Sequence, residues 1–376
     1  MKKLIYIASA PIDFAKLDGV AKKILDQCNA FYKAGFDVDI IYRTGQSILL
    51  YNIESKISKY LRKGRSYLDV LITAKKLVGE YGSVYVRYPK SEHFLISLMK
   101  GFKKFGAKIV IEIPTFPYHK EGIHSLKGRI IAYLDKFFRN QLHKYVDRIC
   151  TYSADDEIFG IKTIRTINGI DFSRFIPDLT PVDSNEINLI AVSSMYIVHG
   201  YDRLIEGMYN YYKEGGDRRI HLHIIGEGDV DEDYKALVAN RGLCSHVTFY
   251  GKKFGEDLNA LYKQQHMGVN SLAIHRQDLT QESTLKTKEY AAMGLPIISS
   301  SYVDAFSKSG NRKYVFTIPP DETPINVKSL IGFVDSLYNE NNIDKLRNAI
   351  RNEGKRTCDM INTLKPVIDF YNEEEI

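Results

Sequence analysis

The sequence is poor in cysteine and lacks a long apolar stretch, and each absence excludes a class of protein. Its four cysteines, at positions 28, 150, 244 and 358, are far apart and form no CxxC pair. This spacing argues against a zinc site or a disulfide scaffold and favours a reducing, cytoplasmic compartment. No segment approaches the roughly 20 apolar residues that a membrane-spanning helix requires. The short apolar run at the N-terminus stops at Pro11 and Asp13, so a buried strand explains it better than a signal peptide.

The chain is long enough for two domains, and its charge is unevenly distributed. At 376 residues it exceeds the size at which one hydrophobic core usually keeps growing. Residues 1–175 hold 30 Lys and Arg against 17 Asp and Glu, whereas the remainder holds 22 against 29. A basic half joined to an acidic half indicates that one domain faces an anionic surface or substrate. Random drift of solvated surface charge is the alternative.

Short apolar runs alternate with helix-period segments along the whole chain. We expect strands at 3–9, 37–43, 83–89, 107–114, 147–153 and 162–169, and again at 187–194, 220–228, 246–252, 266–272, 295–301 and 313–319. A basic helical stretch is expected between 44 and 82. This alternation predicts parallel sheets with helices on both faces, as in Rossmann-like doubly wound α/β domains.

The pattern restarts after a segment without periodicity that contains Pro177 and Pro181. We therefore predict an N-terminal domain over 1–175, a C-terminal domain over 187–360, and a helix over 361–376 that packs back on the first domain. Ligands of such sheets bind beyond the carboxyl ends of the strands. Two domains of this kind would enclose a substrate cleft between them.

The segment 281–300 carries the clearest chemical signal. A polar loop leads into a helix expected near 285–293, which ends at Gly294 before a buried strand. The amide groups and partial positive charge of a helix N-terminus suit a diphosphate. Lys286 stands where the helix begins and adds a full charge, and Glu289, about one turn further on, is placed to bind two ribose hydroxyls. The alternative is a capped surface helix with both side chains in water.

The residues at 283–296, Ser-Thr-Leu-Lys-Thr-Lys-Glu-Tyr-Ala-Ala-Met-Gly-Leu-Pro, resemble the donor-site signature of retaining family 4 glycosyltransferases (glycosyltransferase group 1), which have the GT-B fold. Other blocks resemble the same family in the same order: Asp18-Gly19-Val20, Ile167-Asn168-Gly169-Ile170-Asp171, His199-Gly200-Tyr201-Asp202-Arg203-Leu204-Ile205, Ile225-Gly226-Glu227-Gly228 and Phe249-Tyr250-Gly251. The resemblance covers nearly the whole chain. It implies two Rossmann-like domains facing a central cleft, a nucleotide-sugar donor and a site that needs no metal or other cofactor. The LKTKEY form is typical of a polysaccharide-building subgroup.

The resemblance also implies which residues bind the donor. They are Gly19, His199, Gly226, Ser283, Thr284, Leu285, Lys286 and Glu289. The family often has two glutamates eight positions apart, the first touching the donor sugar and the second the ribose. Counting back eight from Glu289 gives Gln281. Either the Gln281 amide replaces the first carboxylate, or Glu282, one place on, takes that catalytic role.

The phosphate-binding positions depart further from the family pattern. His199 replaces a lysine that is expected to meet the diphosphate, and Ser194 lies in the region where an arginine is usual. Lys286, with Lys252 or Lys253 as further candidates, is expected to supply the missing positive charge.

In the N-terminal half, a strand runs into an irregular loop, Glu112-Ile-Pro-Thr-Phe-Pro-Tyr118-His119. It resembles an EIPTYPY block of the same subgroup, which makes Glu112 and Tyr118 candidates for the acceptor side. A stiff loop with a solvated glutamate is the alternative. Asp37 and Asp39 have the spacing of a metal-holding DxD pair but lie within a strand, so we assign no metal site.

Basic segments interleaved with aromatic residues lie at 59–65, 100–104 and 127–145. On the last of these, apolar side chains recur at helical spacing: Ile130, Leu134, Phe137, Phe138 and Leu142. They form either a core-facing stripe or a peripheral face for an anionic membrane. Nucleic acid is not expected as a partner, because no nucleic-acid module accompanies the charge.

The sequence therefore predicts a retaining glycosyltransferase. It would move a sugar from a nucleoside-diphosphate donor, with a UDP-sugar favoured, to a glycan or lipid-linked glycan in bacterial-type surface polysaccharide synthesis. Two alternatives are a nucleotide-sugar epimerase on the same fold and a non-catalytic nucleotide- or glycan-binding module.

Overall fold

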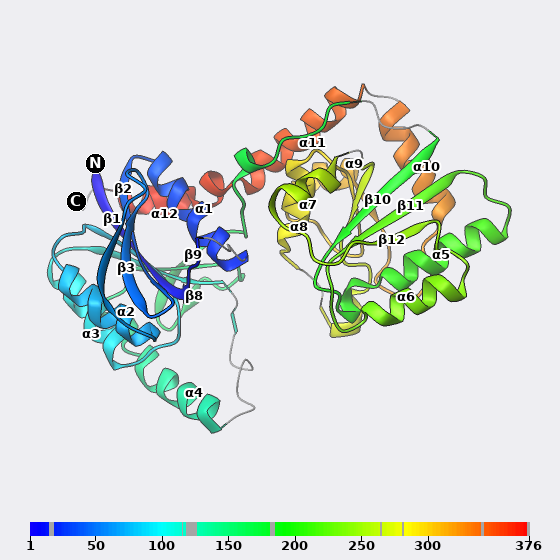
Figure 1. The fold of residues 1–376 in the computed structure, drawn as a ribbon. Helices are drawn as coiled ribbons and strands as arrows, with labels where there is room; N and C mark the ends of the chain where they lie inside the picture. Colours follow the sequence, from blue (N-terminus) through cyan, green and yellow to red (C-terminus); the bar gives the residue numbers. More distant parts are fainter. Residues whose placement is uncertain are drawn as a thin grey trace. The chain divides into compact units, whose positions relative to one another are not determined.

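The computed structural model describes residues 1–14, 19–114, 116–117, 126–180, 185–263, 265–279, 282–339 and 342–373. The chain divides into two compact units, one made of Met1–Ile167 with Thr363–Ile376 and the other of Asn168–Asn362. The first unit is therefore built from both ends of the sequence (Figure 1).

The N-terminal unit is built on a mixed sheet. Its described strands are β1 (Lys2–Pro11), β2 (Phe36–Thr44), β3 (Ser47–Asn52), β4 (Ser58–Lys63), β5 (Ser83–Arg87), β6 (Lys108–Ile113), β7 (Arg148–Thr151), β8 (Glu157–Ile158) and β9 (Ile161–Arg165). They follow the order β4-β3-β2-β1-β5-β6-β7-β9-β8. The six neighbouring strands β2, β1, β5, β6, β7 and β9 pair in parallel. At the two edges of the sheet, β3, β4 and β8 pair antiparallel to their neighbours.

The helical stretch expected between 44 and 82 is wrong for its first part, which forms β3 and β4. Gly45, with a φ of 53°, lies in a two-residue turn that pairs Thr44 with Ser47. Tyr60 and Arg62 then alternate with Leu61 and Lys63 along the outermost strand. Basic residues on an edge strand discourage pairing with other chains, so their abundance here did not indicate a helix. Helix α2 (Tyr67–Ala74) begins only after this hairpin.

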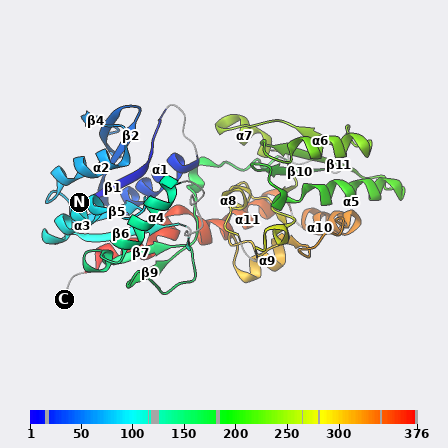
Figure 2. The same ribbon diagram turned by 90° about the horizontal axis from the view of Figure 1, so that it is seen from below.

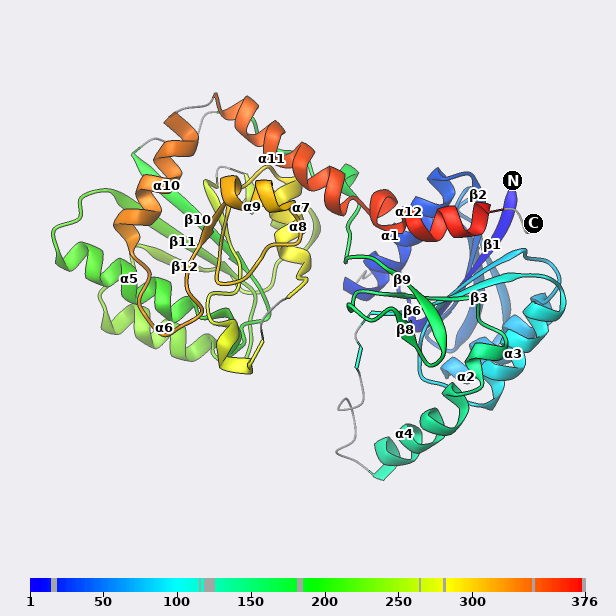
Figure 3. The same cartoon turned by 180° about the vertical axis from the view of Figure 1, so that it is seen from behind.

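Helices cover both faces of this sheet (Figures 1 and 3). On one face lie α1 (Gly19–Lys33) and α12 (Met360–Asn372), and Tyr371 of α12 donates a hydrogen bond of 2.7 Å to the Val84 carbonyl of β5. The ring of Phe31 on α1 lies 5.3 Å from Tyr85 and 6.1 Å from Tyr371. The opposite face of β1 packs against α2 and α3 (His93–Lys104).

Helix α4 (Leu126–Arg139) has an apolar outer side. Asp135 faces inward, where its carboxylate accepts hydrogen bonds from Tyr88 (2.6 Å) and from the Ser91 amide (2.6 Å). Of the apolar side chains singled out in the sequence, Phe138 and Leu142 pack against the core. Leu134 and Phe137 are instead exposed. The stripe therefore divides between the two faces of the helix, and the side chain of Ile130 lies outside the described residues.

The C-terminal unit contains a parallel sheet. Its described strands are β10 (Glu186–Val192), β11 (Arg219–Ile225), β12 (Val247–Phe249), β13 (Met267–Val269), β14 (Ile297–Ser299) and β15 (Val315–Thr317), in the order β12-β11-β10-β13-β14-β15. Every pairing among them is parallel. The carboxyl ends of these strands consequently gather at one edge, where the sequence analysis places the ligand.

Two groups of helices cover this second sheet. On one face lie α5 (Tyr201–Lys213), α6 (Asp231–Asn240) and α10 (Val327–Asn339). The other helices are α7 (Gly255–Tyr262), α8 (Leu285–Ala292), α9 (Lys308–Tyr314) and α11 (Ile343–Cys358). Helices α8 and α11 run side by side (Figure 2). Gly294, with a φ of 73°, permits this approach, because a Cβ atom there would lie 2.6 Å from the Arg347 carbonyl oxygen.

Candidate active site

The predicted donor residues of the second unit lie at the carboxyl edge of its sheet. The loops that follow β10, β11, β13 and β14 meet there, and α8 starts among them. The first turn of α8 has no side-chain cap, because Thr284 at the N-cap position makes no hydrogen bond to the amides of the helix. An uncapped N-terminus offers unpaired N–H groups and a partial positive charge to a ligand. The predicted capped surface helix is therefore not what the structure shows.

Lys286 is buried beside this N-terminus. It is 7% exposed, and its Nζ lies 3.3 Å from His199 Nδ1 and 5.9 Å from the centre of the Tyr201 ring. Among the residues that the structure describes, no carboxylate oxygen lies within 4.0 Å of it. Burial lowers the pKa of Lys286 to about 8, and the charge of Glu282 only partly opposes this shift. A buried cation without an ion-pair partner is poised to receive an anion.

His199 does not carry the charge of the lysine that it replaces. Burial, together with the neighbouring charge of Lys286, lowers the pKa of His199 to about 3. An ammonium group can only donate, so His199 Nδ1 is the acceptor of the contact with Lys286. The ring also stacks on Tyr201, with centres 5.7 Å apart. His199 therefore orients Lys286 and is not itself a second cation.

Glu282 is held by the loop that follows β13. Its Oε1 accepts a hydrogen bond of 2.7 Å from Asn270 Nδ2, and its Oε2 accepts one of 2.8 Å from Ser271 Oγ. Asn270 also accepts from the Thr284 hydroxyl at 3.2 Å. Glu282 is half-buried, so the carboxylate keeps contact with the site while its direction is fixed. Asn270 and Ser271 were not foreseen, although their position directly after a strand is a signal that could have found them.

The hydroxyl of Ser283 is likewise engaged within the protein. It donates to Asp304 Oδ2 and accepts a hydrogen bond of 3.1 Å from Lys288 Nζ. Lys288 is fully buried and also pairs with Asp304 Oδ1. Ser283 therefore has its side chain turned toward this ion pair, and its contribution to a ligand would come from its backbone.

Glu289 lies one turn into α8 and is half-buried. Its Oε2 accepts a hydrogen bond of 2.6 Å from the hydroxyl of Tyr262, a fully buried residue at the end of α7. This contact fixes the carboxylate, whose lone pairs can accept further hydrogen bonds. Leu285 is the first residue of α8 and is also half-buried.

Gly226 has a packing role in the loop that follows β11. Its φ is 125°, and a Cβ atom there would lie 1.8 Å from the Ser193 carbonyl oxygen. Its amide donates to the Gly251 carbonyl at 2.9 Å. The glycine therefore brings the loops after β10 and β11 together, and its N–H is not available to a phosphate.

Three other predicted residues are placed elsewhere. Gln281 and Tyr118 lie outside the described residues. Gly19 begins α1 of the N-terminal unit, and a Cβ atom there would meet nothing within 4 Å.

Glu112 is fully buried in the N-terminal unit. Its carboxylate accepts hydrogen bonds from Gln27 (2.7 Å), Tyr152 (2.7 Å) and Arg87 (3.0 Å). These contacts join α1 to the ends of the central strands. The alternative of a solvated loop glutamate is wrong, and the predicted direct contact between Glu112 and an acceptor does not fit this burial either.

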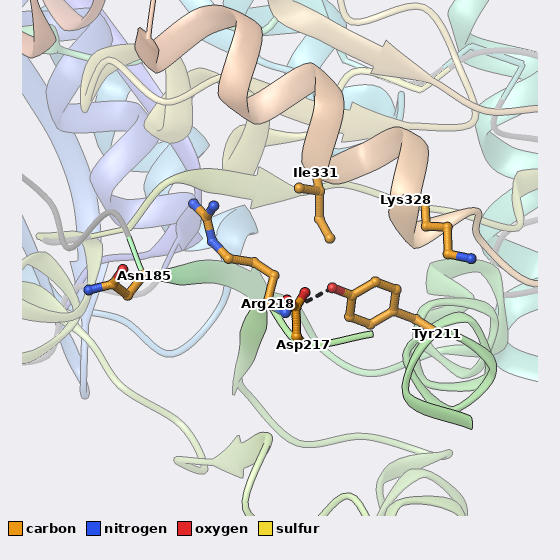
Figure 4. A pocket seen from close by; sticks show the side chains of 6 residues that line it. All are labelled: Asn185, Tyr211, Asp217, Arg218, Lys328 and Ile331. Atoms are coloured by element: carbon orange, nitrogen blue, oxygen red, sulfur yellow. Dashed lines mark hydrogen bonds between the residues drawn. The ribbon is translucent and has the colours of Figure 1, made fainter. Parts of the chain in front are cut away.

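A cavity of about 550 Å³ lies at the amino end of the second sheet, lined by Asn185, Tyr211, Asp217, Arg218, Lys328 and Ile331 (Figure 4). No group of three or more potential metal ligands occurs among the residues described. Asp37 and Asp39 both accept hydrogen bonds from the Asn52 amide and so join β2 to β3. Within the described chain, no helix has the length and apolarity to cross a bilayer.

Comparisons with solved structures define the fold. A glycosyltransferase from Rickettsia africae ESF-5 is 16% identical, with a TM-score of 0.65 over 99% of this chain and 98% of that one. HepE of Anabaena in complex with UDP is 12% identical, with a TM-score of 0.60 over 99% and 100%. A sucrose-phosphate synthase from Thermosynechococcus elongatus is 14% identical, with a TM-score of 0.59 over 99% and 98%. The fold is thus GT-B.

The sequence of the second unit is similar to one known family. Residues 186–333 match the model of the family described as Glycosyl transferases group 1. This part of the C-terminal unit is therefore similar to the glycosyltransferases of that family. A search of curated proteins finds no match.

Proposed function

We propose that the protein transfers a sugar from a UDP-sugar to a glycan or lipid-linked glycan, with retention of the anomeric configuration. The observation that carries the donor assignment is Lys286, a buried lysine without an ion-pair partner among the described residues, beside the uncapped N-terminus of α8. Both features attract a diphosphate. HepE, which shares the fold, has been solved with UDP and with UDP-glucose, which supports a UDP-sugar as the first donor to test.

Each group at the site has a part in this reaction. Negative charge develops on the departing diphosphate, and Lys286 with the α8 amides stabilises it. Glu289, fixed by Tyr262, accepts hydrogen bonds from the ribose hydroxyls. Glu282 or Gln281 contacts the donor sugar. Because lysine and the helix dipole supply the positive charge, we propose that the reaction needs no metal ion.

A donor screen followed by product analysis tests this proposal. Nucleotide sugars are compared by thermal shift, since a ligand that binds only the folded protein raises the melting temperature of the protein. The stabilising donor is then incubated alone and with glycan acceptors, and the product is analysed by NMR. A new glycosidic bond with the donor's anomeric configuration supports retaining transfer, and an inverted bond refutes retention. An epimerised donor without acceptor would indicate the alternative enzyme, and binding without turnover would indicate a binding module.

We further propose that the acceptor is met at an anionic membrane, on which α4 docks. The outer side of this helix exposes Tyr133 (73%), Phe137 (61%), Leu134 (40%) and Ile131 (39%). Lys136 lies among them and is also exposed, within a half of the chain that carries excess positive charge. Exposed aromatic and basic residues on one helix face suit the interface of an anionic bilayer.

Co-sedimentation of the full chain with vesicles tests this docking. Vesicles containing anionic phosphatidylglycerol should bind the protein at low salt and release much of it at high salt. Replacing Tyr133 and Phe137 by serine removes roughly 1–2 kcal/mol of burial each, so partitioning should fall at least tenfold. Ile176→Ser, which changes an exposed apolar side chain of the other unit, is the matched control. Equal binding of all variants would exclude the helix face as the docking surface.

A further inference from the structure

An ion pair between a fully buried lysine and a partly exposed aspartate lies beside the proposed donor residues. Lys288 is fully buried two residues after Lys286, and it pairs with Asp304 in the loop that follows β14. Ser283 bridges the two, since its hydroxyl donates to Asp304 and accepts from Lys288 at 3.1 Å. Lys288 therefore has a different role from Lys286, although both stand in the same helical turn.

The pair controls the segment that leads into α8. The side chains of Glu282, Ser283 and Thr284 are all tied to loops at the carboxyl ends of strands, the first and third through Asn270 and the second through Asp304. Because no side chain caps α8, the direction of its first amides depends on how this segment is held. Because the Ser283 and Thr284 side chains are turned inward, the backbone of these two residues is left to meet the ligand.

The loop that carries Asp304 is itself firmly attached. Asn311 of α9 donates to the Val303 carbonyl at 2.8 Å and accepts from the Val303 amide at 2.9 Å. Thr357 of α11 donates to the Ala305 carbonyl. Asp304 is thus held in place by its loop, and its contacts with Ser283 and Lys288 fix the residues that lead into α8.

Stability does not explain such a pair. Removing the Lys288 charge from water costs several kcal/mol, so its ion pair with the partly exposed Asp304 adds little to the free energy of unfolding compared with a well-packed neutral pair. The pair instead fixes the position of the 282–284 segment. Lys288 can donate to Ser283 and to Asp304 at the same time only when this segment has the position seen in the structure.

We propose that Lys288 and Asp304 are positioning residues, which hold Ser283 so that the first turn of α8 receives the donor diphosphate. This inference rests on the proposed function, because it assumes that the diphosphate binds at that turn. It predicts that loss of the pair weakens donor binding while the chemical step proceeds at a similar rate once the donor is bound.

The experiment compares variants of the full chain by UDP titration calorimetry, steady-state kinetics and melting temperature. Lys288→Met with Asp304→Asn removes both charges and so avoids an unpaired buried ion. We expect a melting temperature close to that of the unmodified protein, a donor KM at least tenfold higher and a kcat within threefold. Lys328→Met with Glu214→Gln removes an exposed ion pair of the same unit and is the matched control, with no effect expected.

Ser283 supplies a second test that leaves the ion pair in place. Ser283→Ala should raise the donor KM. Ser283→Thr keeps the hydroxyl, so its donor KM should stay close to that of the unmodified protein. A double variant of normal melting temperature and normal donor KM would overturn the proposal, as would an unchanged KM in Ser283→Ala. If the unmodified protein itself fails to bind UDP and every UDP-sugar tested, the donor assignment fails instead, so the two failures are distinguishable.

Discussion

Replacing Lys286 by methionine tests the donor site most directly. Methionine keeps most of the length and apolar contact of the lysine chain but removes the charge. Because Lys286 has no carboxylate partner among the described residues, the substitution leaves no carboxylate unpaired. It should therefore affect the ligand more than the fold. Loss of a hydrogen bond to a charged group costs about 1.5–3 kcal/mol, which corresponds to a roughly 10- to 150-fold weaker affinity for the donor.

The same substitution should stabilise the protein without ligand. The pKa of Lys286 in the folded state is about 8, below its ordinary value of 10.5. The folded protein thus releases this proton more readily than the unfolded chain does. The cost of the buried charge is present below pH 8 and disappears as the pH rises to 10.5. At pH 7 this cost is on the order of 3 kcal/mol, so Lys286→Met should raise the melting temperature by several degrees.

Donor affinity should also depend on pH through this lysine. A bound diphosphate favours the charged form and raises the pKa of Lys286, so affinity should fall as the pH rises above about 8. Between pH 7.5 and 9.5 the fall should be roughly 20-fold, a range in which the phosphates themselves stay fully ionised.

Titration calorimetry with the donor at pH 7.5, 8.5 and 9.5 measures both effects in one series. The unmodified protein should lose affinity steadily, whereas Lys286→Met should bind weakly and equally at each pH. Unchanged affinity in the variant at pH 7.5 would refute the assignment of Lys286 to the diphosphate. An identical pH profile for both proteins would refute the idea that this lysine causes the dependence.

Three further predictions concern other parts of the site and fold. Glu289→Ala should weaken UDP binding by about 1.5–3 kcal/mol, measured by calorimetry, and Tyr262→Phe should produce a smaller loss because it removes one hydrogen bond to the carboxylate but keeps the carboxylate itself. Activity should persist after prolonged treatment with EDTA, and restoration of lost activity by Mg²⁺ or Mn²⁺ would contradict the proposed absence of a metal. Gly226→Ala should lower the melting temperature strongly, because its Cβ would overlap the Ser193 carbonyl oxygen, whereas Gly19→Ala, with nothing within 4 Å, should melt close to the unmodified protein.

The sequence predicts the strands well where apolar runs are continuous. The buried segments of β1, β5 and β10 are readily predicted as strands, because a parallel strand covered on both faces is apolar throughout. The β3–β4 hairpin was missed because its edge strand is basic and half-exposed, so no apolar run identifies it. The amphipathic pattern of α4 indicates a helix but leaves open which apolar residues face the core.

The sequence indicates a candidate site, but it does not reveal the contacts that each side chain makes. Order and spacing indicated Lys286 and Glu289, since a helix N-terminus and the residue one turn on are defined along the chain. The neutral state of His199 depends on a lysine 87 positions away and on burial, which spacing does not reveal. Lys288 looked like one more basic residue on a helix, and only the position of Asp304 in space shows it to be buried and paired.

Helix α12 links the folding of the N-terminal unit to a segment made late in synthesis. Tyr371 completes the face of the first sheet that β5 and α1 begin, yet it is separated from Val84 by 287 positions of sequence. A ribosome finishes the C-terminal unit before it releases this segment, so the N-terminal unit must wait for its last helix while its partner is already able to fold. A shortened chain that ends before Thr363 would leave a strip of apolar surface open on α1 and β5, and it should aggregate even though every donor-site residue named above is present.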